Sequence, residues 1–162
     1  MAEAPAASVL LSTYNAPAAL EKVLRGYFVQ ERRDFEILIA DDGSSGHTAD
    51  LLARLAPESP VALTHVWQPD TGFGKCRILN KAMALARGAR LIVSDGDCVP
   101  RADFVSRHMA AARAGAFLAG GYFKLPAGAS AALDRGAIES GAAFGLGWLR
   151  RHGVPLNEKC LK

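Results

Sequence analysis

The chain has 162 residues, of which 50% are hydrophobic, with 19 Lys and Arg against 16 Asp and Glu. This length and hydrophobic content exclude a disordered chain and predict a single domain, residues 1–162, with its own core. The net charge of +3 is only mildly basic, and without a Lys/Arg-rich run or a nucleic-acid-binding motif we expect no nucleic-acid partner.

The first predicted strand follows a short Ala/Pro-rich leader. Residues 1–7 lack a basic region, and the apolar run after them is too short for a signal peptide or a membrane span, so we expect no integral membrane segment. Residues 8–12 (SVLLS) form a short apolar strand, which Thr13-Tyr14-Asn15 follows. Apolar residues at helical spacing then predict a helix over residues 17–30.

The second strand covers residues 35–40 (FEILIA) and ends in Asp41-Asp42-Gly43-Ser44-Ser45. A short helix over residues 48–55 follows it, because three Leu side chains fall on one face. The alternating, β-rich residues 61–67 (VALTHVW) predict a third strand.

A Gly-bearing loop, residues 68–74, precedes a helix predicted over residues 75–87, which Gly88 ends. Residues 91–94 (LIVS) form a short apolar run bounded by turn residues, which predicts a buried strand. This strand runs into Asp95-Gly96-Asp97. Two carboxylates so close repel each other unless a cation lies between them, and a hard divalent ion is the natural partner.

Downstream of the Asp pair the patterns predict a helix over residues 100–114, a fifth strand over residues 116–123 and a weakly patterned helix over residues 129–140. Residues 141–162 carry no clear pattern. The alternation of strands and helices predicts an α/β fold with three layers, in which helices cover both faces of a mainly parallel sheet. We expect the strand order 3-2-1-4, because right-handed crossovers then bring the ends of strands one, two and four to the same edge.

Polar side chains at that edge suit a nucleoside diphosphate. Tyr14 can lie against a base, Asp42 can accept a base N–H, Asp95 can reach the ribose, and Asp97 can hold a cation that bridges the phosphates. No G-x-G-x-x-G follows the first strand and no P-loop motif is present, which argues against a dinucleotide-binding domain and excludes a P-loop protein.

The three stretches SVLLSTYN, FEILIADDGSSGHT and QPDTGFGKCRILNKAMALARGARLIVSDGDCVP occur in that order over residues 8 to about 124. Together they resemble the family 2 glycosyltransferases of Rossmann-like GT-A fold, and among these the bacterial chondroitin-polymerase-type subgroup. The resemblance implies transfer of a sugar, with inversion, from a nucleotide-sugar donor, usually a UDP-sugar, to a saccharide or glycolipid acceptor, as in polysaccharide biosynthesis. It also implies a divalent metal, Mn²⁺ or Mg²⁺.

Carried over by position, the resemblance implies that Ser12, Tyr14 and Asp42 hold the nucleotide and that Asp95 and Asp97 form the D-x-D metal pair, Asp97 being nearer the ion. The family commonly has Arg at the positions of Gly74 and Leu79, so other polar residues become candidate contacts. The candidate donor-binding residues are Ser12, Tyr14, Asn15, Asp41, Asp42, Lys75, Asn80, Asp95 and Gly96, with Lys75, Arg77 and Asn80 as the polar contacts in place of the missing arginines.

The family's general base is an acidic residue well downstream of the D-x-D pair. Residues 125–162 contain only Asp134, Glu139 and Glu158, and none of them lies in an acidic motif. We therefore expect the base to be absent and the chain to be the N-terminal, nucleotide-sugar-binding part of a longer catalytic domain.

Three alternatives remain open from the sequence. The chain can be a donor-binding fragment without activity, or the run LIVSDGDCV can be the nucleophile strand of a haloacid-dehalogenase-type phosphatase, although such enzymes carry the Asp pair on their first strand. The two Asp residues can also be simple turn residues in water. Three widely spaced cysteines, Cys76, Cys98 and Cys160, form no metal or disulfide pattern, so we expect a cytoplasmic protein, which can lie at the inner face of the membrane.

Overall fold

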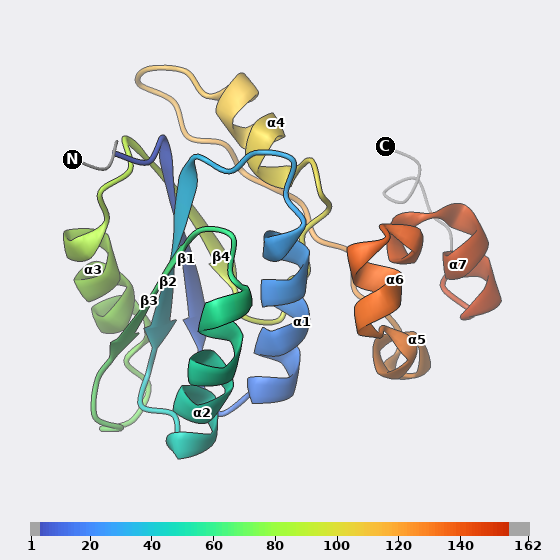
Figure 1. The fold of residues 1–162 in the computed structure, drawn as a ribbon, viewed down its shortest axis with the longest axis horizontal. Coiled ribbons are helices and arrows are strands. Elements are labelled where there is room, and N and C mark those ends of the chain that lie inside the picture. Colours follow the sequence, from blue (N-terminus) through green and yellow to red (C-terminus); the bar gives the residue numbers. More distant parts are fainter. Residues whose placement is uncertain (1–3, 156–162) are drawn as a thin grey trace.

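A four-stranded sheet with every strand parallel forms the centre of the computed structural model, which describes residues 4–155 (Figure 1). The strand order is β3-β2-β1-β4, as predicted from the sequence. In register, Leu10 of β1 lies between Leu38 of β2 and Val93 of β4. The strands are β1 (Ala7–Thr13), β2 (Phe35–Asp41), β3 (Ala62–Trp67) and β4 (Arg90–Asp95).

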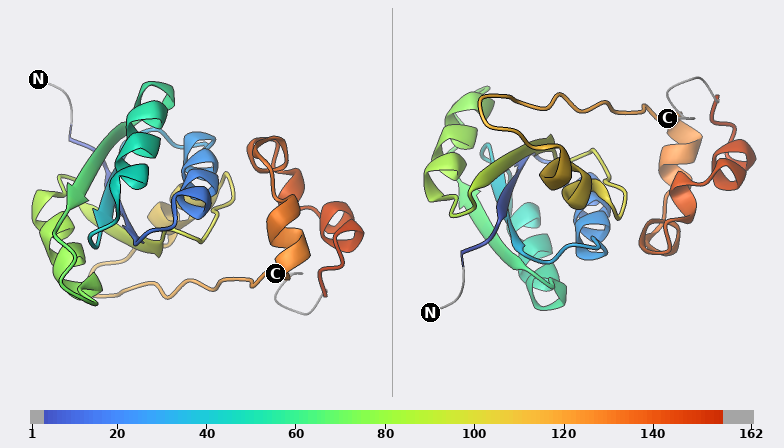
Figure 2. Two further views of the ribbon diagram at one scale, coloured as in Figure 1. Left: turned by 90° about the horizontal axis from the view of Figure 1, so that it is seen from below. Right: turned by 90° about the horizontal axis from the view of Figure 1, so that it is seen from above.

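Helices cover both faces of the sheet and give three layers (Figures 1 and 2). Helices α1 (Pro17–Phe28) and α2 (Gly46–Leu55), with the short 3-10 turn η1 (Ala56–Glu58), lie on one face, and α3 (Lys75–Leu85) lies on the other. Because side chains alternate along a strand, Val9 and Leu11 pack among α1 and α2, whereas Leu10 packs against α3. The predicted helices 17–30, 48–55 and 75–87 are confirmed, with ends shifted by a few residues.

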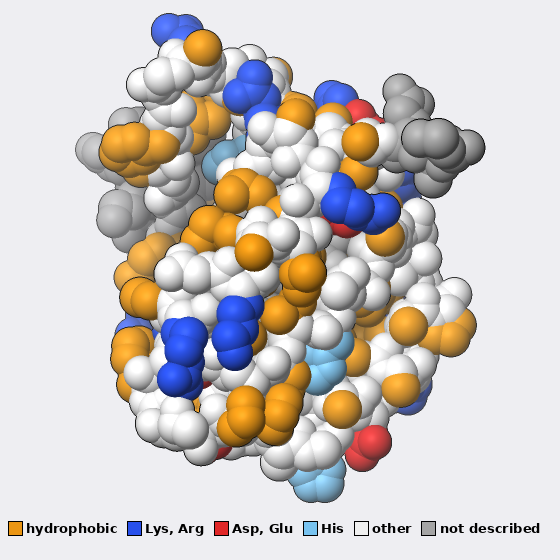
Figure 3. All heavy atoms as spheres, turned by 90° about the vertical axis from the view of Figure 1, so that its left-hand side faces the viewer, with side chains coloured by type: hydrophobic (Ala, Val, Ile, Leu, Met, Phe, Trp, Pro, Cys, Tyr) orange, Lys and Arg blue, Asp and Glu red, His pale blue; other side chains and the backbone are white. Residues whose placement is uncertain are grey.

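Strand β4 is less buried than its apolar sequence predicts. Only Ile92 is buried, among the side chains of α1 and β1, while Leu91 and Val93 are about half exposed on the face that carries α3. Helix α3 packs mainly over β1 and β2, so it does not reach this part of the sheet. Figure 3 looks onto that side of the molecule and shows hydrophobic side chains at its surface.

Two further predictions after the Asp pair are wrong. Residues 116–123 form no strand, because this segment has no sheet partner, and Phe117 is 90% exposed. The helix expected over 129–140 is two helices, α5 (Ala127–Ala132) and α6 (Arg135–Glu139), because the Asp134 carboxylate accepts a hydrogen bond from Ala137 N (2.7 Å) and starts a new helix.

Residues 127–151, which form the last helices, lie beyond α1 on the side away from the sheet (Figure 2). Helix α4 (Phe104–Ala111) is shorter than the predicted 100–114 and packs Val105 into the core beside α1. Beyond α6, the 3-10 turn η2 (Ala142–Phe144) and helix α7 (Leu146–Arg151) form small apolar clusters with α5 and α6. Lys22 of α1 donates a hydrogen bond to Ser130 O (2.7 Å), and Arg25 pairs with Glu139 (3.8 Å). Glu158 and Cys160 lie outside the described residues.

A buried polar cluster joins three segments at the amino ends of the strands. The Glu36 carboxylate accepts hydrogen bonds from Ser8 Oγ (2.7 Å) and from Arg87 N and Nε (2.7 and 2.9 Å). Gly88 N donates to Ser8 Oγ (2.8 Å), and a Cβ on Gly88 would lie 2.4 Å from the backbone of Ala7 and Ser8. Gly88 therefore does not cap α3, which ends at Leu85; it permits a close backbone approach.

Glu36 should make unfolding sensitive to acid. Burial alone would raise the pKa of Glu36, but the hydrogen bonds from Ser8 and Arg87 outweigh it and hold the pKa below the ordinary 4.5. A carboxyl with a lowered pKa in the folded state stabilises the fold above its unfolded pKa, and this contribution is lost as the pH falls through the folded pKa. We therefore expect Glu36→Gln to be less stable than wild type at neutral pH and to show a shallower loss of stability below about pH 4.5.

Urea denaturation at several pH values measures this difference. Glu31→Gln, which removes an exposed carboxylate, is the control for the change in net charge. If the free energy of unfolding falls equally steeply for Glu36→Gln and wild type as the pH is lowered below 6, Glu36 is not responsible for the loss of stability in acid.

Candidate functional site

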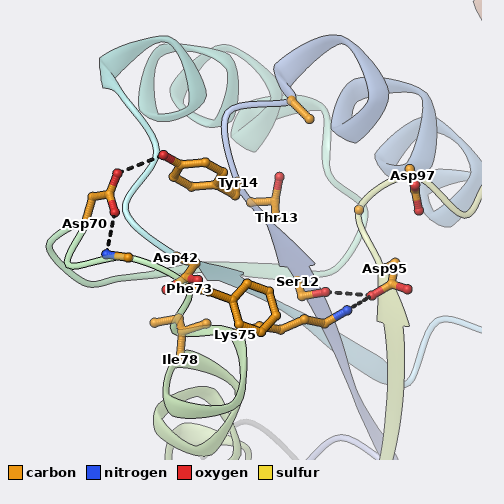
Figure 4. A pocket seen from close by; sticks show the side chains of 13 residues that line it. Ser12, Thr13, Tyr14, Asp42, Asp70, Phe73, Lys75, Ile78, Asp95 and Asp97 are labelled. Atoms are coloured by element: carbon orange, nitrogen blue, oxygen red, sulfur yellow. Dashed lines mark hydrogen bonds and ion pairs between the residues drawn. The ribbon is translucent and has the colours of Figure 1, made fainter.

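A cavity of about 480 Å³ lies at the carboxyl ends of the strands, where the sequence predicts the site (Figure 4). It is built from the ends of β1 and β4, the loop after β2, and the loop that leads from β3 into α3. Carboxyl ends of parallel strands leave backbone and side-chain groups free to bind ligands. The cavity is lined by Ser12, Thr13, Tyr14, Ala16, Asp42, Asp70, Gly72, Phe73, Lys75, Ile78, Asp95, Gly96 and Asp97.

Asp95 is the centre of the contacts on the β4 side. Its Oδ1 accepts hydrogen bonds from Ser12 Oγ (2.8 Å) and Lys75 Nζ (2.5 Å). The ion pair with Lys75 is the main reason that the pKa of Asp95 lies below its ordinary value. Gly96 N donates to Ser12 O (2.8 Å), and a Cβ on Gly96 would lie 2.8 Å from that oxygen, so the turn between the two Asp residues requires a glycine.

Asp97 presents an exposed carboxylate at the same edge. Among the described residues, its hydrogen-bond partner is the Cys98 thiol, with Sγ 3.5 Å from Oδ1. Burial raises the pKa of Cys98 to about 11, which keeps this thiol protonated at neutral pH. One ligand atom from each of Asp95, Asp97 and Cys98 lies within 4.8 Å of the other two, a cluster that can hold a metal ion. The two carboxylates supply the hard oxygen donors that Mn²⁺ and Mg²⁺ prefer.

Asp42 is buried, and both of its carboxylate oxygens accept hydrogen bonds from other residues of the chain. Gln68 Nε2 donates to Oδ1 (2.6 Å), and Gly74 N donates to Oδ2 (2.7 Å). A carboxylate offers about four acceptor positions, so capacity remains for a ligand N–H. Asp42 therefore also fixes the loop between β3 and α3, a role that the sequence did not indicate.

Tyr14 contacts that loop from the other side. Its hydroxyl donates to Asp70 Oδ2 (2.8 Å), and Gly72 N donates to Asp70 Oδ1 (3.0 Å). The contact with Asp70 raises the pKa of Tyr14, so its phenol stays neutral. The Tyr14 side chain is 52% exposed and lines the cavity beside Asp42 (Figure 4).

Four residues predicted for the site do not line the cavity: Asn15, Asp41, Arg77 and Asn80. Asn15 joins two loops: its Oδ1 accepts from Ser45 N (2.9 Å) and its N donates to Ser44 Oγ (2.8 Å). Asp41 is fully buried and accepts from Ser44 N, while His65 Nε2 lies 2.9 Å from its Oδ2. Asn80 is exposed on α3.

Two lining residues that sequence reasoning missed are Asp70 and Phe73, both in the loop before α3. The sequence feature that could have indicated them is the loop itself. It follows a strand at the ligand-binding edge and contains two glycines that let its backbone turn. The downstream acidic residues lie elsewhere, because Asp134 caps α6 and Glu139 pairs with Arg135 (2.8 Å) and with Arg25.

The comparisons with known proteins agree with this geometry. The sequence model "Glycosyl transferase family 2" matches residues 8–132. An uncharacterized glycosyltransferase of Bacillus subtilis, YfnE, is 32% identical over 106 residues, which are 65% of this chain and 26% of that protein. Chondroitin synthase of Escherichia coli is 27% identical over 103 residues, 63% of this chain and 15% of that protein.

A solved structure gives the same fold. The mannosyltransferase PcManGT from Pyrobaculum calidifontis, determined in complex with GDP-Man and Mn²⁺, has a TM-score of 0.59 and 28% identity. The match covers 66% of this chain and 32% of that one. This chain thus spans less than a third of the length of each of these three relatives.

The sheet order, the acidic edge and this neighbour define an α/β protein of the GT-A glycosyltransferase class. The chain belongs to glycosyltransferase family 2. The phosphatase alternative is not favoured. Such phosphatases carry the Asp pair on their first strand, whereas here the pair follows the fourth strand of a family 2 glycosyltransferase chain. Within residues 4–155, none of the helices has the length and apolar character needed to span a bilayer.

Proposed function

We propose that this chain binds the nucleotide-sugar donor of an inverting, metal-assisted glycosyltransferase. The observation that carries the proposal is the convergence of Tyr14, Asp42, Asp95 and Asp97 on one cavity from three different strand ends. The donor-bound relative PcManGT, which was solved with GDP-Man and Mn²⁺, supports the same class of ligand. The donor we favour is a UDP-sugar.

Each side chain has a separate part in holding the donor. Tyr14 packs against the base and Asp42 accepts one of its N–H groups. Ser12 and Lys75, which already contact Asp95, lie where they can reach the ribose and the phosphates. A buried, charge-assisted hydrogen bond such as the one from the base to Asp42 contributes more than a neutral one.

Asp97, assisted by Asp95, would hold the divalent ion. A bound Mn²⁺ or Mg²⁺ supplies neutralisation of the diphosphate, which makes it a better leaving group. Lys75 adds a second positive charge beside Asp95 and limits the repulsion between the two carboxylates.

Membership of the family suggests a class of acceptor and a cellular role. We propose a saccharide or glycolipid acceptor, as in polysaccharide biosynthesis. Cys76 and Cys98 are free thiols, which suits a cytoplasmic location at or near the inner face of the membrane. Since Asp134 and Glu139 are engaged away from the cavity, we propose that the general base comes from residues other than these two.

Titration calorimetry with UDP and GDP, each with and without Mn²⁺, tests the proposal. We expect a nucleoside diphosphate to bind this chain, and to bind more tightly when Mn²⁺ is present. Hydrolysis of p-nitrophenyl phosphate under the same conditions is the control for the phosphatase alternative. If UDP, GDP, ADP and CDP all fail to bind with or without the metal, the chain is not a donor-binding domain.

A further inference from the structure

Phe73 is the most exposed large hydrophobic side chain among the described residues, with 91% of its surface accessible, and it lines the donor cavity. Single exposed apolar residues are common and need no explanation by themselves. Phe117 is 90% exposed as well, but it lies in the unpaired segment before α5, outside the cavity. Phe73 differs because its backbone is held in place.

Hydrogen bonds fix the loop on both sides of Phe73. Gly72 N donates to Asp70 Oδ1 (3.0 Å), and Gly74 N donates to Asp42 Oδ2 (2.7 Å). A Cβ on Gly74 would lie 2.7 Å from both Asp42 Oδ1 and Gln68 Nε2, so a larger residue here would displace these two side chains. The loop therefore presents the ring from a defined position.

The buried side chain of Gln68 connects this loop to Asp42 and Arg77 through hydrogen bonds. It is 1% exposed, and its Nε2 donates to Asp42 Oδ1 (2.6 Å) while its Oε1 accepts from Arg77 Nε (3.1 Å). Arg77 in turn donates to Thr71 Oγ1 (2.7 Å). A partly buried hydrogen-bond network that fixes the loop under an exposed aromatic ring is the arrangement of a preorganised contact, because little loop entropy is then lost on binding.

We propose that Phe73 is a second aromatic contact for the donor's base, on the loop before α3, in addition to Tyr14 on the loop after β1. The two rings come from different loops and line the same cavity, which Asp42 and Ile78 also line (Figure 4). The inference rests on the proposed function. A stacked ring accepts any base, because every base has a π-face, so Phe73 contributes affinity while Asp42 contributes the choice of base.

The test measures UDP and GDP binding in the presence of Mn²⁺ for Phe73→Ala, Phe73→Leu and Phe73→Tyr. We expect Phe73→Ala to weaken both nucleotides by on the order of tenfold, by similar factors, as loss of one base–aromatic stack does. Phe73→Tyr should bind as wild type, and Phe73→Leu should fall in between. Phe117→Ala is the matched control, since it removes an equally exposed ring outside the cavity.

Thermal unfolding of the same variants separates stacking from a structural effect. Because the ring is almost fully exposed, Phe73→Ala should leave the midpoint of unfolding unchanged. Wild-type affinity in Phe73→Ala, or full affinity in Phe73→Leu, would overturn the inference, as would a lowered midpoint that accompanies the weaker binding. If the wild-type chain binds no nucleotide at all, the proposed function is wrong and this inference with it.

Discussion

Replacing Asp97 by Asn should weaken Mn²⁺-dependent UDP binding by on the order of a hundredfold, because metal affinity depends on the charge of the ligands. Asn keeps the shape of the side chain but removes its negative charge. UDP binding without metal, and the stability of the fold, should change little, since Asp97 is exposed and its hydrogen-bond partner among the described residues is the weak thiol donor of Cys98.

The measurement is the UDP dissociation constant as a function of Mn²⁺ concentration. Asp95→Asn should have a smaller effect on the metal dependence, because Asp95 is shared with Ser12 and Lys75. Asp50→Asn removes an exposed carboxylate on α2, outside the cavity, and controls for net charge. Metal dependence like that of wild type in Asp97→Asn would remove this residue from the metal site and leave two solvated turn residues as the better account.

Replacing Asp42 by Ala should weaken nucleotide binding with or without metal, by about 3 kcal/mol or on the order of a hundredfold. The substitution removes the acceptor for the base and also the two hydrogen bonds that fix the loop through Gln68 and Gly74. Because Gln68 is buried, its Nε2 then loses its short hydrogen bond and keeps the longer one to Gly74 O (3.3 Å), and the free energy of unfolding should fall by about 1–3 kcal/mol.

Two readouts separate the base contact from the loop effect. Loss of the loop alone should weaken UDP and GDP equally, whereas loss of an acceptor for a base N–H should also change the ratio of the two affinities. Calorimetry and urea denaturation of the same preparation give both quantities. Undiminished UDP affinity in Asp42→Ala would show that the residue only stabilises the loop.

The fold could be predicted largely because its signals are local. Apolar residues at helical spacing, such as Leu20, Val23 and Leu24, locate α1, and short apolar runs locate the strands. The handedness of the crossovers then gives the strand order. The prediction of a fifth strand failed because the apolar residues within 116–123 do not supply a partner strand. The break at Asp134 was missed because it depends on the cap made by a single side chain.

The site could be located from the sequence, but the direction of individual side chains could not. Asp41 and Asp42 are neighbours at the end of β2; Asp41 is fully buried beside His65, and Asp42 lines the cavity. Sequence spacing does not decide which of two adjacent carboxylates faces a ligand once the strand ends. Asp70 and Phe73 were missed because a loop has no periodicity that would show which of its side chains reach the cavity.

The position of β4 in the sheet sets the order in which the site can assemble during folding. Strands β1 and β2 pair across only one helix, so that Ser8 and Glu36 are 28 residues apart, whereas the Ser12–Asp95 contact joins residues 83 apart. Closing the longer loop costs more chain entropy, and non-local pairings of this kind form slowly. The half of the site that carries Tyr14 and Asp42 can therefore form with β1 and β2, while the carboxylates for the metal arrive only when β4 docks beside β1. A donor that needs both halves binds only the completed sheet, so its binding energy stabilises the last strand to join.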